Sequence, residues 1–455
     1  MTKEEHDQNG RTADGYASRR QYLRLTGAVG VASIAGCQDS SGGDGETATS
    51  TETATESPTA TATEDSSGGL ATNEDQSASA DIQSTLIATW RGTDPTSSIT
   101  LQWLAKGDGA QDSVPVTLSP TGADGSTSEV ETGTAQFGDS EIQRHRAEPT
   151  DLQPDTEYRV QIGDTDLDPV IRTAPETLTA PITFAEGGDL GSGGETVKLH
   201  EQAAEWDPLF AFVGGDLAYA DGVNTRKWLS FLDMWNENMR SGDRLIPIVA
   251  AIGDHEVAAS QNKTTNDPSD APFFNALFDN PEREQAYWAF DAGDYLSMLV
   301  LDSTQTAAVG GAQTRWLDKR LTERTDRQHL MAAKHIPAYP SAKAIHALGT
   351  DAIREHWVPL FEEYDVDIVF EHDGHAYKRT HRLRGGETDA ENGIQYVGDG
   401  GWGQHLRDPK STEERPYLKQ SEGSHNVLGV TIRPDGTRSV RAVDPDGNTI
   451  DEFEQ

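Results

Sequence analysis

Four apolar runs, each leading into a turn rich in Gly and Asp, constrain the fold of this chain most strongly. Stretches with helical character separate some of these runs, and buried strands that alternate with helices predict a largely parallel sheet covered by helices. Ligands of such folds bind beyond the carboxyl ends of the strands. We therefore expect an α/β domain over residues 179–455. The expected strands are 182–185, 209–213, 246–252 and 367–370, and the expected helices are 226–239, 314–322 and 351–364.

Side chains that bind metals follow the ends of these strands. A Gly in most of these segments lets the backbone turn sharply. Carboxylate and imidazole donors that converge from several strand ends suit a two-metal site, which can hold the attacking and leaving oxygens of a phosphoryl transfer. The segments are Gly188-Asp189-Leu190-Gly191, Gly215-Asp216-Leu217-Ala218-Tyr219, Gly253-Asp254-His255-Glu256, Lys334-His335-Ile336-Pro337 and His372-Asp373-Gly374-His375.

The order of these segments resembles that of the calcineurin-like metallophosphoesterases. Their motifs are Gly-Asp-x-Gly, Gly-Asp-x-x-Tyr, Gly-Asn-His-Glu/Asp, a lone His, and Gly-His-x-His. The tyrosine of the second motif, here Tyr219, resembles the purple acid phosphatase branch in particular. The resemblance covers roughly residues 82–403 and implies a four-layer α/β/β/α sandwich for the catalytic domain.

The resemblance also implies a role for each donor. It implies a ferric ion at the first site and Mn²⁺, Fe²⁺, Mg²⁺ or Zn²⁺ at the second, with one residue bridging the two. The implied ligands are Asp189, Tyr219 and His375 for the first metal, Asp216 for the bridge and His335 for the second metal.

Two further histidines have implied catalytic roles. His255 stands where the family neutralises the phosphoryl oxygens in the transition state. His346 stands where family members carry a histidine that contacts the substrate and protonates the leaving group.

The second metal site departs from the family pattern at two positions. Asp254 replaces the family's Asn, and Asp373 aligns with the first His of Gly-His-x-His, with His372 in place of the Gly. Either Asp373 is the ligand, together with Asp254, or His372 takes its place after a local shift of the backbone. Both replacements still offer donors that bind metals.

The region before the α/β domain has a different pattern. Short alternating stretches at 86–90, 99–103 and 114–116, separated by Gly, Asp and Pro, predict a β-sandwich over residues 81–178. Near its end, Leu152-Gln153-Pro154-Asp155-Thr156-Glu157-Tyr158 resembles the Leu-x-Pro-x-Thr-x-Tyr signature of a fibronectin type III domain. The resemblance implies a corner hydrogen bond for Tyr158, and we expect this all-β domain to be a spacer.

The first 80 residues resemble export and anchoring segments. Residues 1–37 contain the pair Arg19-Arg20, a short apolar run and Ala-Gly-Cys ending at Cys37, which indicates a twin-arginine lipoprotein signal. Residues 38–80 are rich in Thr, Ser and Glu and predict a disordered stalk. We expect a protein anchored on the outer face of the cell membrane through a lipid on Cys37 alone. This single cysteine excludes an internal disulfide.

The charge of the chain excludes one class of partner. With 76 acidic against 37 basic residues and a formal net charge of −39, most of the surface would repel a nucleic-acid backbone. We expect no nucleic-acid partner. The same acidity is typical of proteins from organisms that accumulate salt, and we expect a halophilic source.

The expected function is hydrolysis of small phosphate monoesters, by a metal-dependent, acid-phosphatase-like enzyme. The family mechanism implies a metal-bound hydroxide as the nucleophile at the dinuclear centre. Two alternatives stay open: a phosphodiesterase or nucleotide hydrolase of the same fold, or a non-catalytic surface binding protein with a degenerate metal site.

Overall fold

The computed structural model describes residues 81–91, 94–107, 110–122, 126–258, 265–278, 285–347 and 349–455. The predicted signal at 1–37, with Arg19, Arg20 and Cys37, and the predicted stalk at 38–80 lie outside the described residues. Among the described helices, none has both the length and the apolar character that a bilayer crossing requires.

Two large sheets form the centre of the α/β part. The first has ten strands in the order β25-β24-β23-β9-β10-β13-β1-β2-β6-β5, and the second has seven in the order β14-β15-β16-β17-β21-β18-β22. The strands of the first sheet, in this order, are Thr449–Glu454, Arg438–Val443, Val427–Ile432, Ile182–Gly187, Ala211–Val213, Ile248–Ala250, Ile87–Thr89, Thr100–Ala105, Gln143–Ala147 and Gly133–Gln136. Those of the second are Trp288–Ala292, Leu296–Leu301, His329–Lys334, Ile368–Glu371, Gln395–Gly398, Tyr377–Thr380 and Leu418–Glu422.

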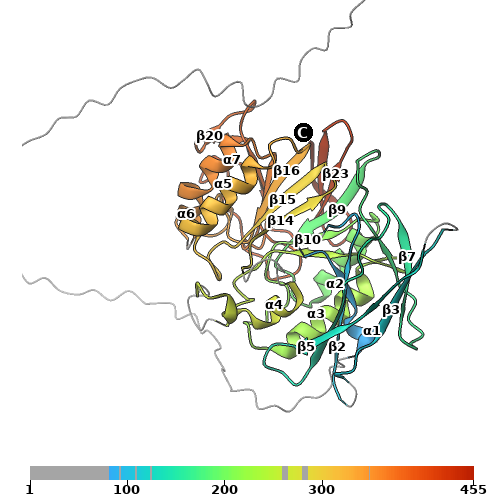
Figure 1. Cartoon of the computed structure of the whole chain (residues 1–455). Helices are drawn as coiled ribbons and strands as arrows, with labels where there is room; N and C mark the ends of the chain where they lie inside the picture. Colours follow the sequence, from blue (N-terminus) through green and yellow to red (C-terminus); the bar gives the residue numbers. More distant parts are fainter. Residues whose placement is uncertain are drawn as a thin grey trace, which may run out of the picture. The chain divides into compact units, whose positions relative to one another are not determined.

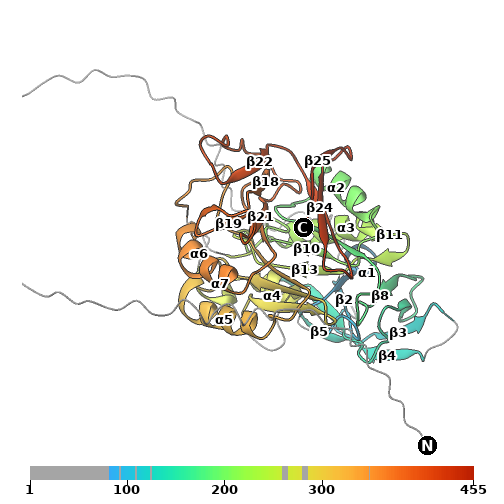
Figure 2. The ribbon, with the colours of Figure 1, turned by 90° about the horizontal axis from the view of Figure 1, so that it is seen from above.

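Helices cover the outer faces of these two sheets. Helices α2, α3 and α4 share a buried cluster with one face of β9, β10 and β13, and α5, α6 and α7 share another with β15, β16 and β17. Figures 1 and 2 show the two helical layers on opposite sides of the strands. The helices are α1 (Ile82–Thr85), α2 (Gly194–Ala204), α3 (Thr225–Asn238), α4 (Pro272–Phe278), α5 (Thr314–Thr322), α6 (Thr350–His356) and α7 (Val358–Glu363), with short helical turns η2 (Pro268–Asp270) and η3 (Val309–Gln313).

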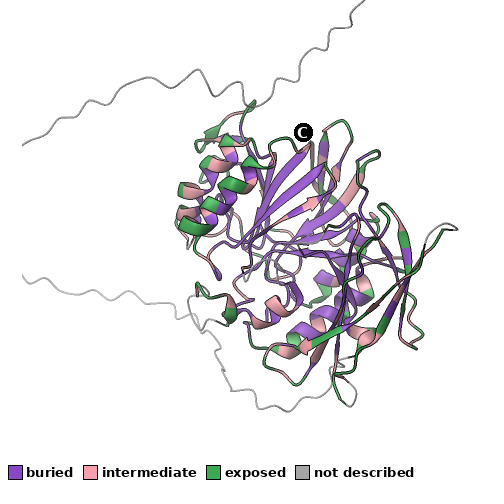
Figure 3. Cartoon of the chain, viewed as in Figure 1, coloured by how far each residue is buried: buried purple, intermediate pink, exposed green. Residues whose placement is uncertain are grey.

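A third buried cluster fills the space between the sheets. Aromatic side chains of β9 and β17 meet there, with the rings of Phe184 and Phe370 6.3 Å apart in an edge-to-face arrangement. Figure 3 shows the central strands buried, while the helices expose their outer faces. The order of layers is therefore helix, sheet, sheet, helix, and the expected α/β/β/α fold is confirmed.

The parallel strands determine where the site lies. Strands β9, β10 and β13 run parallel to one another, and so do β15, β16, β17 and β21 in the other sheet. The carboxyl ends of parallel strands meet at one edge of a sheet. The residues that follow β9, β10, β13, β16 and β17 are those that the sequence analysis selected.

The N-terminal strands form a sandwich that continues the first central sheet. One layer is β1, β2, β6 and β5, and β1 pairs in parallel with β13 through Thr89 and Ile248. The Tyr158 hydroxyl accepts a hydrogen bond from the Gln153 amide at 2.7 Å, as its sequence signature predicts. The sequence pattern does not predict that β1 joins the first central sheet. The other layer consists of β11 (Arg240–Ser241), β12 (Arg244–Leu245), β8 (Val170–Arg172), β7 (Glu157–Ile162), β3 (Pro115–Pro120) and β4 (Ser128–Glu131), while β19 (Leu383–Arg384) and β20 (Glu387–Thr388) form a separate hairpin.

One predicted helix is divided in the structure. The helix expected over 351–364 is observed as α6 and α7, separated at Trp357. Pro359 lies in the first turn of α7 and has no N–H to donate to the preceding turn, so the chain starts a new helix there. The helix predicted at 314–322 has the observed bounds of α5.

Candidate metal centre

The turns after the strands hold several site residues in an uncommon backbone conformation. The φ angles are positive at Asp189 (60°), Asp216 (55°), Tyr219 (53°), Asp373 (70°) and His375 (54°). Positive φ is uncommon for residues other than glycine, and it is retained where the surrounding structure requires it. Each turn directs the side chain of its positive-φ residue across the carboxyl ends of the central strands. These side chains therefore converge on one region beyond the strand ends.

Asp189, Tyr219 and His375 meet at one end of this region, and we call them the first donor group. The Tyr219 hydroxyl donates to Asp189 Oδ1 at 3.2 Å and lies 3.2 Å from His375 Nε2. His375 Nε2 lies 3.1 Å from Asp189 Oδ1. A side chain at Gly400 would have its Cβ 1.7 Å from Asp189 Oδ2, so only glycine allows the 398–403 loop to pass this close.

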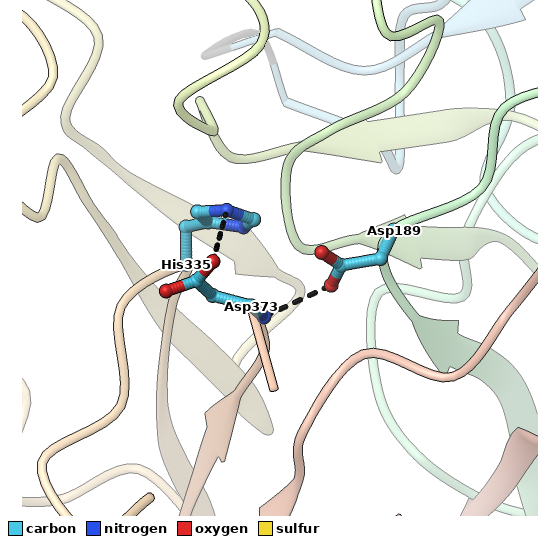
Figure 4. Close-up of side chains that lie close together, drawn as sticks. All are labelled: Asp189, His335 and Asp373. Atoms are coloured by element: carbon cyan, nitrogen blue, oxygen red, sulfur yellow. Dashed lines mark hydrogen bonds and ion pairs between the residues drawn. The ribbon is translucent and has the colours of Figure 1, made fainter. Parts of the chain in front are cut away.

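The second donor group consists of Asp216, Asp254, His335 and Asp373. His335 Nε2 lies 3.1 Å from Asp254 Oδ1, 3.5 Å from Asp216 Oδ1 and 3.7 Å from Asp373 Oδ1. The Asp373 amide donates to Asp189 Oδ2 at 2.9 Å and so links the two donor groups. Figure 4 shows His335, Asp373 and Asp189 side by side at this junction. The structure thus brings together all seven residues that the sequence predicted as metal ligands.

Backbone carbonyls orient both imidazoles of the donor groups. His335 Nδ1 lies 2.9 Å from the Gly214 carbonyl, and His375 Nδ1 lies 2.9 Å from the His405 carbonyl. A carbonyl oxygen can only accept, so each Nδ1 carries the proton and donates it. Nε2 of each ring is then left to coordinate a metal from within the cluster.

The side chains of His372 and Asp373 point in different directions. His372 Nε2 lies 2.7 Å from Glu186 Oε1, and its Nδ1 donates to the Lys334 carbonyl at 2.9 Å. Both ring nitrogens are therefore engaged in the interior between the sheets. The Asp373 carboxylate instead faces His335. Of the two candidates that the sequence left open, Asp373 lies with the other donors.

Glu256 holds two of the strand exits in place. Its buried carboxylate accepts hydrogen bonds from the amides of Asp216 (2.7 Å), Leu217 (2.9 Å) and Gly253 (2.8 Å). The turns after β10 and β13 are thereby tied to each other. Asp216 Oδ1 also accepts from the His255 amide at 2.8 Å. These bonds fix the Asp216 carboxylate before any ligand arrives.

The charges of the cluster fit a site for cations. Burial, followed by repulsion from Asp254, raises the pKa of Asp216 well above its ordinary value. Burial also raises the pKa of Asp373. Although burial alone would lower it, the Asp216 carboxylate and its neighbours hold the pKa of His335 well above its usual range. With Asp189, four carboxylates face two imidazoles, and bound metal ions would compensate this excess of negative charge.

The two predicted catalytic histidines occupy different surroundings. The half-buried His255 packs against Tyr219 with ring centroids 4.4 Å apart, and its Nε2 lies 3.9 Å from Asp216 Oδ2. Its Nδ1 bonds to Asp221. The side chain of His346 is 79 % exposed, with Nδ1 2.9 Å from Asp351. The structure therefore joins His255 to the cluster but not His346, whose role in proton transfer stays a prediction.

Two cationic residues beside Asp373 were not predicted from the sequence. Lys343 Nζ contacts the Asp373 carboxylate, and Arg407 Nη1 donates to the Asp373 carbonyl at 2.6 Å. Neither residue lies in a recognisable motif. Lys343 lies three positions before His346, and Arg407 follows the glycine-rich 398–403 loop. Only the folded chain shows that both lie at the site.

Comparisons with known proteins agree with this geometry. The model of the calcineurin-like phosphoesterase family matches residues 162–376. An uncharacterized protein of Mycobacterium tuberculosis is 29 % identical over 313 residues, which cover 59 % of this chain and 56 % of that protein. Purple acid phosphatase 23 of Arabidopsis thaliana is 26 % identical over 281 residues, which cover 55 % of this chain and 60 % of that protein. The chain thus matches just over half the length of these relatives.

A solved structure supports the same relationship at the level of the fold. The purple acid phosphatase from yellow lupin seeds superimposes with a TM-score of 0.67 at 18 % identity, covering 81 % of this chain and 73 % of that one. Residues 162–376 therefore match the calcineurin-like phosphoesterase family, and the chain resembles the purple acid phosphatases in sequence and in fold.

Proposed function

We propose that the chain hydrolyses phosphate monoesters at a centre of two metal ions held by the two donor groups. The convergence of seven donors from five strand exits carries this proposal, together with the excess of buried negative charge. In the proposed centre, Asp189, Tyr219 and His375 hold one ion, and Asp254, His335 and Asp373 hold the other. Asp216, a member of the second donor group, is the proposed bridge between the two ions.

The residues of the chain prepare this centre for a phosphoryl group. Two bound ions would lower the pKa of a water molecule and offset the charge of the phosphoryl oxygens. His335 and His375 can present Nε2 to the ions, because the Nδ1 of each ring is held by a backbone carbonyl. We assign to His255, half-buried beside Tyr219, the neutralisation of charge on the phosphoryl oxygens at the rim of the cluster.

The test is a metal and substrate panel on the folded protein in molar salt. We expect turnover of p-nitrophenyl phosphate that a chelator abolishes and added metal restores. Mn²⁺ should restore more activity than Zn²⁺, because the carboxylates of Asp254 and Asp373 favour harder ions. Faster turnover of bis-(p-nitrophenyl) phosphate would instead indicate a phosphodiesterase. Binding of metal without turnover of either ester would indicate a non-catalytic binding protein.

A ferric first site predicts a coloured protein. If Tyr219 coordinates Fe³⁺ as a phenolate, charge transfer should give concentrated protein a visible absorption band. Tyr219→Phe should remove this band while iron remains detectable by elemental analysis. Tyr158→Phe, which removes a tyrosine hydroxyl in the N-terminal sandwich, should leave the band unchanged. A colourless, iron-loaded parent protein would contradict the assignment of Tyr219 as a ligand.

We also propose that the chain is exported by the twin-arginine route and anchored outside the cell by a lipid on Cys37. The support is the sequence of residues 1–37 alone. Replacing Arg19 and Arg20 with Lys should retain the protein in the cytoplasm, and Cys37→Ser should release it into the medium. Cell fractionation followed by immunoblotting checks both variants. An unchanged distribution of both would refute the anchor.

A further inference from the structure

Lys343 brings a positive charge to the edge of the second donor group. Its Nζ contacts the carboxylate of Asp373, the residue that also faces His335. The Lys343 side chain is 27 % exposed, so the ammonium lies at the boundary between the buried cluster and solvent. A molecule that approaches the cluster from solvent on this side would meet this group. The proposed function gives Lys343 no role.

The loop that carries Lys343 is held by several hydrogen bonds. The Lys343 carbonyl accepts from Arg415 Nη2 at 2.7 Å, and Arg415 Nη1 donates to the Pro340 carbonyl at 2.8 Å. The Ser341 amide donates to Asp399 Oδ2 at 3.0 Å, and its carbonyl accepts from the Lys410 amide at 3.0 Å. The backbone of this lysine is therefore fixed before a ligand binds, which lowers the entropy lost on binding.

A second cation on another loop adds to this charge. Arg407 donates from Nη1 to the Asp373 carbonyl, and its own amide donates to the His375 carbonyl at 3.0 Å. Lys343 and Arg407 thus approach Asp373 from the loops after β16 and β21. The side of the cluster next to Asp373 is cationic, although the chain as a whole carries a formal net charge of −39. An anion would be attracted to this side.

We propose that Lys343 binds the phosphoryl group of the substrate and favours monoesters over diesters. This inference rests on the proposed function. An ammonium has three protons, so a contact with Asp373 leaves others for a phosphoryl oxygen. A terminal phosphate carries a charge of about −1.5 to −2 at neutral pH and three free oxygens. A diester carries one negative charge, and its second ester group leaves only two free oxygens. The ammonium therefore stabilises the bound monoester more.

The test compares Lys343→Met with Lys343→Arg and with Lys319→Met. Methionine retains the length of the side chain without its charge, and arginine retains the charge. Lys319 lies on α5 with a side chain that is 70 % exposed, so it is the matched control for the loss of a lysine. The measurements are kcat/KM for p-nitrophenyl phosphate and for its bis ester, binding of inorganic phosphate by calorimetry, and metal content.

We expect Lys343→Met to lower kcat/KM for the monoester roughly 10- to 100-fold, the size of one charge-assisted hydrogen bond. The diester should lose less than about threefold, and phosphate should bind more weakly by a factor similar to the loss for the monoester. Lys343→Arg should recover part of each loss, and Lys319→Met should resemble the parent. Metal content should stay the same in all variants.

Other outcomes would overturn the inference. Equal losses on both esters, accompanied by loss of metal, would make Lys343 a support of the metal site. Unchanged phosphate affinity in Lys343→Met would show that the ammonium does not bind the phosphoryl group. If the parent protein turns over neither ester, the proposed function fails. Phosphate calorimetry on the metal-loaded protein then still decides whether Lys343 binds the anion.

Discussion

Asp216→Asn is expected to reduce phosphomonoester turnover on the order of 10³-fold or more. The carboxylate lies 3.5 Å from His335 Nε2, and we propose that it bridges the two metal ions. Metal ions contribute several kcal/mol to stabilising the charge of a transition state. Each 1.36 kcal/mol of such stabilisation corresponds to about tenfold in rate. Steady-state kinetics and elemental analysis of the variant would measure the loss of rate and of metal together.

The same substitution should change stability in opposite directions with and without metal. The pKa of Asp216 is raised in the folded protein, first by burial and then by repulsion from Asp254. The folded state therefore prefers the protonated form, and the stability that this form provides is lost as pH rises from the ordinary range of an aspartate through the raised pKa. Asparagine cannot ionise. At neutral pH the metal-free variant should thus melt at a higher temperature than the metal-free parent.

With metal bound, the order of the melting temperatures should reverse. The parent gains the binding free energy of its ions, whereas the variant has lost the bridging carboxylate. Asp446→Asn, at an exposed turn between β24 and β25, is the matched control and should change neither melting temperature. A metal-free Asp216→Asn protein that melts below its parent would show that Asp216 is stabilised by partners within the chain and is not held ready for a cation.

His372→Ala is expected to cost about 3–5 kcal/mol of unfolding free energy, because it leaves a buried polar group without its hydrogen-bond partner and opens a cavity. Both His372 and Glu186 are fully buried, and the bond between them joins the segment after β17 to β9 in the other central sheet. The alanine variant leaves the Glu186 carboxylate without its partner. It also leaves a cavity, since the imidazole fills the space against Gly214, where a Cβ would lie 1.9 Å from the ring.

Equilibrium denaturation of the metal-free protein measures this loss. Removing both partners, in His372→Ala with Glu186→Ala, should cost less than the sum of the two single changes, because no buried polar group is then left without its partner. The folded His372→Ala protein should retain two metal ions per chain. If it instead loses one ion and little stability, His372 is a ligand of the second metal, and the placement of Asp373 in that role is wrong.

Local sequence pattern and the order of the strands determine much of this fold. Helix α5 has the predicted bounds because its apolar residues recur at helical spacing. The fold and the convergence of the donor side chains could be predicted because each donor follows a strand, and the carboxyl ends of parallel strands meet at one edge. The division between α6 and α7 was also readable in principle, since Pro359 lies inside the predicted helix.

Tertiary contacts decided the rest. The pairing of β1 with β13 joins residues far apart in the chain, and the strand pattern of the N-terminal sandwich contains no information on its partner. Lys343 reaches Asp373 only because Arg415 and Asp399 hold its loop against the site. Each of these contacts depends on packing between elements that the sequence pattern describes separately.

The positions of His372 and Asp373 show this division most clearly. The sequence by itself determined that side chains able to bind a metal follow β17, and the spacing of the motif left two neighbouring candidates. Which of His372 and Asp373 faces the other donors depends on Glu186. This residue lies 186 positions earlier in the chain and bonds to His372 from the other sheet. A buried carboxylate needs a partner, so it holds the imidazole in the interior. The adjacent Asp373 then faces His335, and only the folded structure places these groups together.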